Sequence, residues 1–173
     1  MNTNMNINTS NTLSAKPRWT ALLVLSISLF VIVMVMTILI MALPAIVEEL
    51  QATAIEQLWI VDVYSLILAG LIVTMSFIGD RWGRKKILLL GFLMFSVTSL
   101  LILFVTNATQ IIIIRGVLGL AGAMIMPTTL SMIRTIFVDA KERTIALSVW
   151  AGVTGFGGVL GPIIGGVLLE QFS

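Results

Sequence analysis

The sequence predicts an all-α polytopic membrane protein, and three observations lead to this prediction. Of the 173 residues, 58% are apolar, whereas only ten are Lys or Arg and eight are Asp or Glu. Soluble domains carry roughly 25% charged residues, so this chain lacks the polar surface that a globule in water requires. Uncharged runs long enough to cross about 30 Å of hydrocarbon recur along the chain. The lipid bilayer is therefore the predicted surrounding.

These uncharged runs divide the chain into five predicted transmembrane helices. The run 87–114 is too long for one helix, and the polar stretch 106–110 is the expected turn within it. The five helices are predicted near 19–46, 57–79, 87–105, 110–136 and 143–169.

The two ends of the chain carry separate expectations. Residues 1–15 are rich in Asn, Thr and Ser and are predicted to form a disordered cytoplasmic tail, because they have nothing to bury. The apolar run that follows is about twice as long as the core of a signal peptide, which predicts an uncleaved first helix. The number of helices is odd and the last one runs to the final residues, so further helices are expected to be missing.

Basic residues indicate the orientation. Nine of the ten flank the first helix or lie near the turns after the second and fourth helices. Cytoplasmic loops are enriched in Lys and Arg, so the N-terminus is predicted to be cytoplasmic and Ser173 external in a cell membrane. The opposite side holds acidic residues that fit a solvated rim, namely Glu48, Glu49, Glu56 and Glu170.

Composition also argues against several functional classes. The chain has no Cys and no His, so a disulfide framework, a metal site and a hydrolase triad are not expected. The net charge is +2 and the basic residues are scattered, which gives no electrostatic footprint for nucleic acid. No enzyme activity and no prosthetic group are predicted.

Two ionisable side chains, Asp62 and Arg115, fall inside predicted helices. A charge in the bilayer costs a few kcal/mol on insertion scales, so such residues usually face a cavity or a partner. Both lie about five residues past the start of their helices, which places them at the same depth. We hypothesise that they lie within electrostatic reach, directly or through water, so that exchanging the two charges rescues the neutral variants. A hydrated carboxylate at Asp62 and a packing or ion-pair role for Arg115 remain alternatives.

The turn after the second helix is the densest polar feature. Its sequence is GDRWGRKK over 79–86, in which Asp80 and Arg84 have the i, i+4 spacing of a helical ion pair. Gly83 permits tight backbone geometry. The turn is either a positively charged anchor with one local ion pair or a latch, comprising Asp80, Arg81, Gly83 and Arg84, whose pairing differs between conformations.

Small residues mark one face of the fifth helix. Gly157, Gly161 and Gly165 repeat every four residues, so another helix backbone can approach closely there. Pro162 removes a donor and can bend the helix. Ordinary helix packing is the alternative to a specialised role.

Several motifs resemble those of the major facilitator superfamily. The turn 79–86 resembles its cytoplasmic loop motif, with Ser76 at the position of the leading glycine. The stretch 115–123, RGVLGLAGA, resembles its fourth-helix Arg motif, and 157–166, GGVLGPIIGG, resembles the fifth-helix antiporter motif. Finer similarity over 37–44, 58–66 and 126–134 is to the fourteen-helix drug:proton antiporters, most of all the QacA-type exporters of antiseptics, dyes and quaternary ammonium compounds.

This resemblance implies proton-coupled export of lipophilic cations by alternating access. It makes 16–173 a partial N-terminal transporter domain, the first five helices of a six-helix half. Asp62 and Arg115 would serve proton and cation coupling, and Gly157, Gly161, Pro162, Gly165 and Gly166 would form a hinge and seal against the other half. The QacA-type subfamily carries an Asp where this chain has Val35, so Arg115 would lack the first-helix acid that it faces in relatives and monovalent cations would be preferred.

A second hypothesis remains open. The chain is either the N-terminal portion of such an antiporter, which needs its C-terminal helices, or a truncated remnant that does not transport. In the second case it would persist as a membrane partner that associates through the glycine face of the fifth helix.

Overall fold

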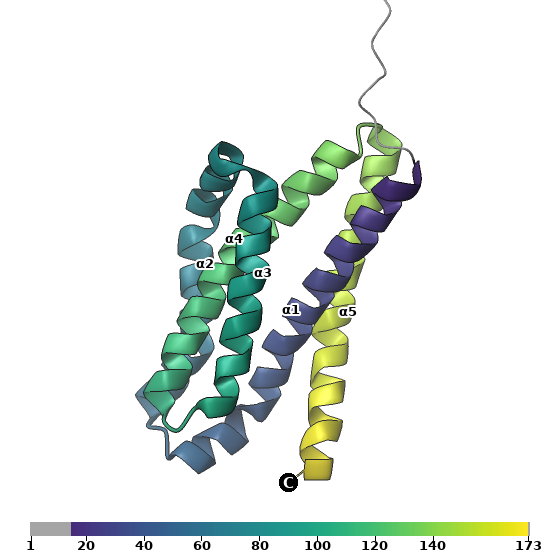
Figure 1. Ribbon diagram of the computed structural model, residues 1–173. Helices are drawn as coiled ribbons and strands as arrows, with labels where there is room; N and C mark the ends of the chain where they lie inside the picture. The colour runs from purple at the N-terminus through teal and green to yellow at the C-terminus, as the bar shows by residue number, and fades with distance from the viewer. Residues whose placement is uncertain (1–14, 173) are drawn as a thin grey trace, which may run out of the picture.

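The computed structural model describes the backbone of residues 15–172 and the side chains of residues 16–167. The predicted tail therefore lies outside the described residues, apart from the backbone of Ala15. Five long helices are joined by short turns (Figure 1), and each is long and apolar enough to cross a membrane. They are α1 (Ala15–Leu50), α2 (Ala54–Trp82), α3 (Arg84–Leu101) with the short 3-10 helix η1 (Ile102–Phe104), α4 (Ala108–Ile136) and α5 (Ala140–Phe172).

Polar side chains explain why three of the helices begin where they do. Thr53 and Glu56 form a capping box, in which each side chain accepts from the other residue's backbone N–H, and α2 begins at Ala54 rather than near 57. The Asn107 side chain accepts from the backbone N–H of Gln110 at 3.0 Å and caps α4. Asp139 does the same for Lys141 and Glu142 at the start of α5. The helices thus extend beyond the uncharged runs, because a cap can start a helix among charged residues.

The helices form two groups around α4. Figure 1 shows α1 beside α5, and α2 and α3 grouped with α4; α2 packs most extensively on α4, and α1 on α5. The main core joins α1, α3, α4 and α5, with Leu118, Ile125, Ile133 and Phe137 fully buried. Of the five helices, α4 is the most buried, so residues that project from it reach side chains of several neighbours.

The outer surface is apolar on all five helices. Leu23 is 58% exposed, Val73 76%, Leu93 62% and Ile113 61%. Water would not stabilise so large an apolar surface, whereas hydrocarbon would. The predicted all-α polytopic fold is confirmed.

Candidate functional site

The guanidinium of Arg115 is held deep between three helices. The side chain projects from α4, is only 3% exposed, and donates from Nε to the backbone oxygen of Ile60 at 2.8 Å. Nη2 donates to the backbone oxygen of Val61 at 3.0 Å, and Nη1 lies 3.2 Å from the sulfur of Met36. The positive charge is therefore stabilised by carbonyl oxygens and a polarisable thioether.

An aromatic ring completes the surroundings of this cation. The guanidinium carbon lies 5.1 Å from the centroid of the Tyr64 ring, within the range of a cation–π interaction. Tyr64 is the only tyrosine in the chain and lies two residues after Asp62, yet the sequence did not single it out. Its proximity to an intramembrane acid was the available signal.

The predicted direct pairing of Asp62 with Arg115 is not formed. Among the described residues the ion pairs are Arg18 with Glu142 and Arg84 with Asp80, and neither includes Asp62. Helical geometry explains the difference, because two residues of separation turn Asp62 roughly 200° away from Ile60, whose side chain is buried against α4. Asp62 is exposed on another face of the turn whose carbonyls receive Arg115. The two residues share a depth but not a contact.

One residue of the first helix contacts Arg115. It is Met36, which also lines a groove of about 390 Å³ together with Val35, Ser99 and Leu118. The first helix thus supplies a thioether, and not a carboxylate, to the guanidinium of Arg115.

Glycines of α4 allow α2 to lie this close. A Cβ added at Gly119 would stand 2.6 Å from the backbone oxygen of Tyr64, and one at Gly122 would stand 2.9 Å from its hydroxyl oxygen. A Cβ at Gly116 would stand 3.1 Å from Ile67. The glycines within the Arg motif therefore create the space in which Tyr64 meets Arg115.

The turn between α2 and α3 contains the expected local ion pair. Nε of Arg84 lies 2.9 Å from the Asp80 carboxylate, and Gly83 has a φ of 105°, which favours glycine. Arg84 also donates from Nη1 to the backbone oxygen of Ser131 at 3.2 Å and to the Thr135 hydroxyl at 2.6 Å. Arg84 thereby ties this turn to the end of α4. Arg81 is exposed, and its role in a latch stays a prediction.

The glycine face of α5 packs against α1 of the same chain. A Cβ added at Gly157 would lie 3.1 Å from Val33, and one at Gly161 would overlap the Thr37 hydroxyl and lie 2.7 Å from its Cβ. A Cβ at Gly165 would meet Met41 at 3.4 Å. The predicted close approach of another helix thus occurs within this chain.

The side of α5 that carries Gly157, Gly161 and Gly165 is covered by α1. A role of these residues as a hinge and seal, or in association with a partner protein, stays a prediction. Gly166 lies on a different side, where an added Cβ meets nothing within 4 Å. Pro162 lies within the continuous helix, between these two sides.

A second ion pair joins the same two helices near their N-terminal ends. Nη1 of Arg18 lies 2.9 Å from the Glu142 carboxylate, and the rings of Trp19 and Phe137 meet edge to face with centroids 5.3 Å apart. The sequence did not predict this pair, because the two residues lie 124 positions apart. No three acidic, His or Cys side chains come together as metal ligands within the searched, described part of the chain.

Comparison with known proteins gives consistent matches over most of the chain. The family model described as Major Facilitator Superfamily matches residues 25–173. The multidrug efflux pump LfrA of Mycolicibacterium smegmatis is 47% identical, over 94% of this chain and 32% of its own length. The methyl viologen resistance protein SmvA of Salmonella typhimurium is 40% identical, over 90% of this chain and 31% of its own.

More distant relatives have similar coverage. The tetracenomycin C resistance and export protein of Streptomyces glaucescens is 34% identical, over 88% of this chain and 28% of its own length. The chain thus spans about a third of the length of the curated relatives that it matches.

Proposed function

The chain belongs to the major facilitator superfamily, and from this membership we propose that it is the N-terminal part of a proton-coupled exporter of hydrophobic cations. Quaternary ammonium compounds and dyes are the proposed substrates, with a proton as the coupling ion and no prosthetic group. Membership makes the protein a multi-pass membrane transporter rather than an enzyme. In this proposal the five helices belong to a six-helix half built from two three-helix repeats.

The names of the relatives support export as the activity. One is a multidrug efflux pump, and another is named for export of tetracenomycin C. A third is named for resistance to methyl viologen, a molecule with two quaternary nitrogens. Since the chain covers about a third of these relatives, the proposed activity belongs to a longer protein with further C-terminal helices.

One observation supports the proposal most strongly. The exposed carboxylate of Asp62 lies on a helical turn that the buried guanidinium of Arg115 holds in place. Arg115 binds the carbonyl oxygens of Ile60 and Val61 and so fixes the turn that bears Asp62. Asp62 is exposed, and in this proposal it exchanges a proton for a cationic substrate. When the proton leaves, the negative carboxylate attracts the cation, so the two compete for one site. Arg115 contributes by positioning and by its positive field.

Position 35 bears on which cations are carried. Val35 supplies no charge where the resembled QacA-type exporters have an acid, which leaves Asp62 as the acidic group of the first two helices at this depth. One carboxylate balances one positive charge. We therefore expect monovalent lipophilic cations to be handled better than divalent ones.

The remaining motif residues receive conformational roles in this proposal. Arg84, paired with Asp80 and bound to the end of α4, would form a gate with Arg81 and Gly83 on the cytoplasmic side. Gly157, Gly161, Pro162, Gly165 and Gly166 would form a hinge, in which the glycine face lets α5 move along α1. The proposed orientation places the N-terminus in the cytoplasm.

Efflux of a fluorescent monovalent dye tests this function. Cells that express the longer protein, loaded with ethidium, should lose the dye in a manner that collapses when the proton gradient is dissipated. Asp62→Asn should reduce efflux by at least tenfold, and Asp62→Glu should retain part of it. Propidium, which shares the ring system but carries two positive charges, should be exported more slowly. Undiminished efflux by Asp62→Asn at equal expression would rule out the proposed coupling residue.

A truncated product that does not transport is the second candidate. Ethidium efflux by residues 1–173 expressed alone would exclude a non-transporting product, whereas efflux by the longer protein alone would agree with the first candidate.

A further inference from the structure

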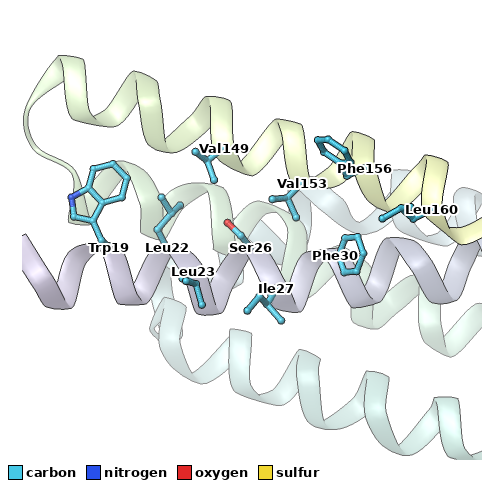
Figure 2. Close-up of a pocket in the computed structure, with 10 residues that line it drawn as sticks. All are labelled: Trp19, Leu22, Leu23, Ser26, Ile27, Phe30, Val149, Val153, Phe156 and Leu160. Atoms are coloured by element: carbon cyan, nitrogen blue, oxygen red, sulfur yellow. The ribbon is translucent and has the colours of Figure 1, made fainter.

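An apolar groove between α1 and α5 contains one polar atom that has no partner. The groove has a volume of about 660 Å³ and is lined on α1 from Trp19 to Phe30 and on α5 from Val149 to Leu160 (Figure 2). Its one hydroxyl belongs to Ser26, whose side chain is 4% exposed and whose Oγ has no hydrogen-bond partner within the described residues. Figure 2 shows this oxygen directed between the two helices.

The other hydroxyls of α1 behave differently. Thr20 donates to the backbone oxygen of Lys16 at 3.0 Å, and Ser28 donates to that of Val24 at 2.8 Å. Thr37 likewise donates to the backbone oxygen of Val33 at 3.0 Å. A buried hydroxyl without a partner is unfavourable, so a ligand group that bonds to Oγ of Ser26 would be stabilised there.

Two contacts between α1 and α5 flank the groove along α1. The Arg18–Glu142 ion pair lies before Trp19, and Val33, which meets Gly157, lies after Phe30. The volume of the groove lies in the range of roughly 300–1,000 Å³ typical of pockets for drug-sized ligands.

The side chains that line the groove favour one chemical class of ligand. Trp19, Phe30 and Phe156 present aromatic rings, and no charged side chain lines the groove. Aromatic faces attract organic cations and stack on planar rings. An acyl chain would fill the space but has no donor or acceptor for Ser26.

From this geometry we infer that the groove is a binding site for planar aromatic cations that carry an N–H group, which donates to Oγ of Ser26. The choice of ligand class rests on the proposed function, whereas the site does not include Asp62. The groove is thus a second place at which the protein holds its substrate, between α1 and α5, apart from the coupling carboxylate.

Ethidium is a suitable probe, because it is a planar cation with two aromatic amino groups. The chain, reconstituted in nanodiscs of phosphatidylcholine, is titrated with ethidium and the rise in dye fluorescence is measured. Ser26→Ala should weaken binding about threefold to tenfold, the effect of one lost hydrogen bond. The matched control is Ser28→Ala, whose hydroxyl already has a partner in α1.

A second pair of variants tests the space itself. Val153→Phe places a ring in the groove and should weaken binding at least tenfold, whereas Val159→Phe makes the same change at a position of α5 that is 63% exposed. Circular dichroism checks that each variant is folded. Binding by both groove variants that equals that of their controls would overturn the inference.

Lipid is the competing occupant. With Trp59, Trp82 and Trp150 replaced by Phe, the fluorescence of Trp19 reports on the groove, and brominated phosphatidylcholine quenches it on contact. Quenching that ethidium relieves supports the site, and quenching that ethidium leaves unchanged means that lipid fills it and overturns the inference.

Binding in nanodiscs does not depend on efflux, so Asp62→Asn should retain ethidium binding. Failure of this site and failure of the proposed function are thus separate results.

Discussion

At the scale of single residues, the cation in the core is neutralised by dipoles rather than by an acid. The sequence identified Arg115 and Asp62 because charges are rare inside apolar runs. It could not identify the true acceptors, since these are the backbone carbonyls of Ile60 and Val61, whose side chains have no polar atom. Backbone acceptors have no signature in a sequence. Of the two arrangements that we expected for Asp62 and Arg115, the direct ion pair is therefore not formed, and an interaction through water stays a prediction.

The contacts of Arg115 predict the outcome of a charge exchange. Asp62→Arg combined with Arg115→Asp should fail to restore ethidium efflux in the longer protein. A carboxylate at position 115 would face carbonyl oxygens, which repel it, instead of a partner that it could accept from. The control is each single variant at matched expression. Recovery to more than about half of wild-type efflux would show that the two residues do interact as a pair.

The same contacts predict that the charge of Arg115 is needed for activity but not for the stability of the chain. Arg115→Met should leave thermal unfolding in detergent unchanged or stabilise the chain by up to about 2 kcal/mol, because it removes a buried charge that has no acidic partner. The carbonyls of Ile60 and Val61 keep their helical partners. Efflux by the longer protein should nevertheless be lost. A drop of more than about 3 kcal/mol would instead assign Arg115 a structural role.

At the scale of helices, glycines set the spacing of both principal pairs. Gly119 and Gly122 bring α2 onto α4, and Gly157 and Gly161 bring α5 onto α1. The sequence predicted close approach on α5 from the four-residue repeat but could not name α1 as the neighbour. Apolar runs located the helices well, whereas their ends were set by caps such as Thr53 and Asp139, which lie outside the apolar pattern.

The α1–α5 contact predicts a specific steric conflict. Gly161→Ala should destabilise the chain by about 1–3 kcal/mol, because its Cβ would overlap the hydroxyl of Thr37. Thr37→Ala should recover part of this loss but not all, since the Cβ at position 37 remains only 2.7 Å away. Gly158→Ala is the control, because an added Cβ there meets nothing within 4 Å. Thermal unfolding of the purified variants measures each effect, and equal stability of Gly161→Ala and Gly158→Ala would contradict the packing.

At the scale of the whole molecule, the fold class and family followed from composition and ordered motifs, and both are confirmed. The QacA-type subfamily stays a prediction, as does the orientation in the membrane. Long-range contacts such as that of Arg18 with Glu142 could not be predicted from the sequence, because no local pattern relates two residues so far apart in the chain.

The predicted orientation can be measured directly, because the chain contains no cysteine. Single variants Gln51→Cys, in the turn after α1, and Arg81→Cys, at the end of α2, should react oppositely with a membrane-impermeant maleimide. Intact cells should label position 51 and leave position 81 unlabelled until the membrane is opened. The reverse pattern would invert the topology, and labelling of both in intact cells would contradict a spanning α2.

The placement of the groups around Arg115 has a consequence for biosynthesis. Its three acceptors all precede it in the chain, by 79 residues for Met36, 55 for Ile60 and 54 for Val61. At about 5–20 residues per second, the ribosome completes the turn at Ile60 roughly three to eleven seconds before it reaches Arg115. The Arg115 side chain can therefore contact its two carbonyl oxygens and the sulfur of Met36 as soon as it leaves the translocon. Its charge then need not remain without acceptors in the lipid.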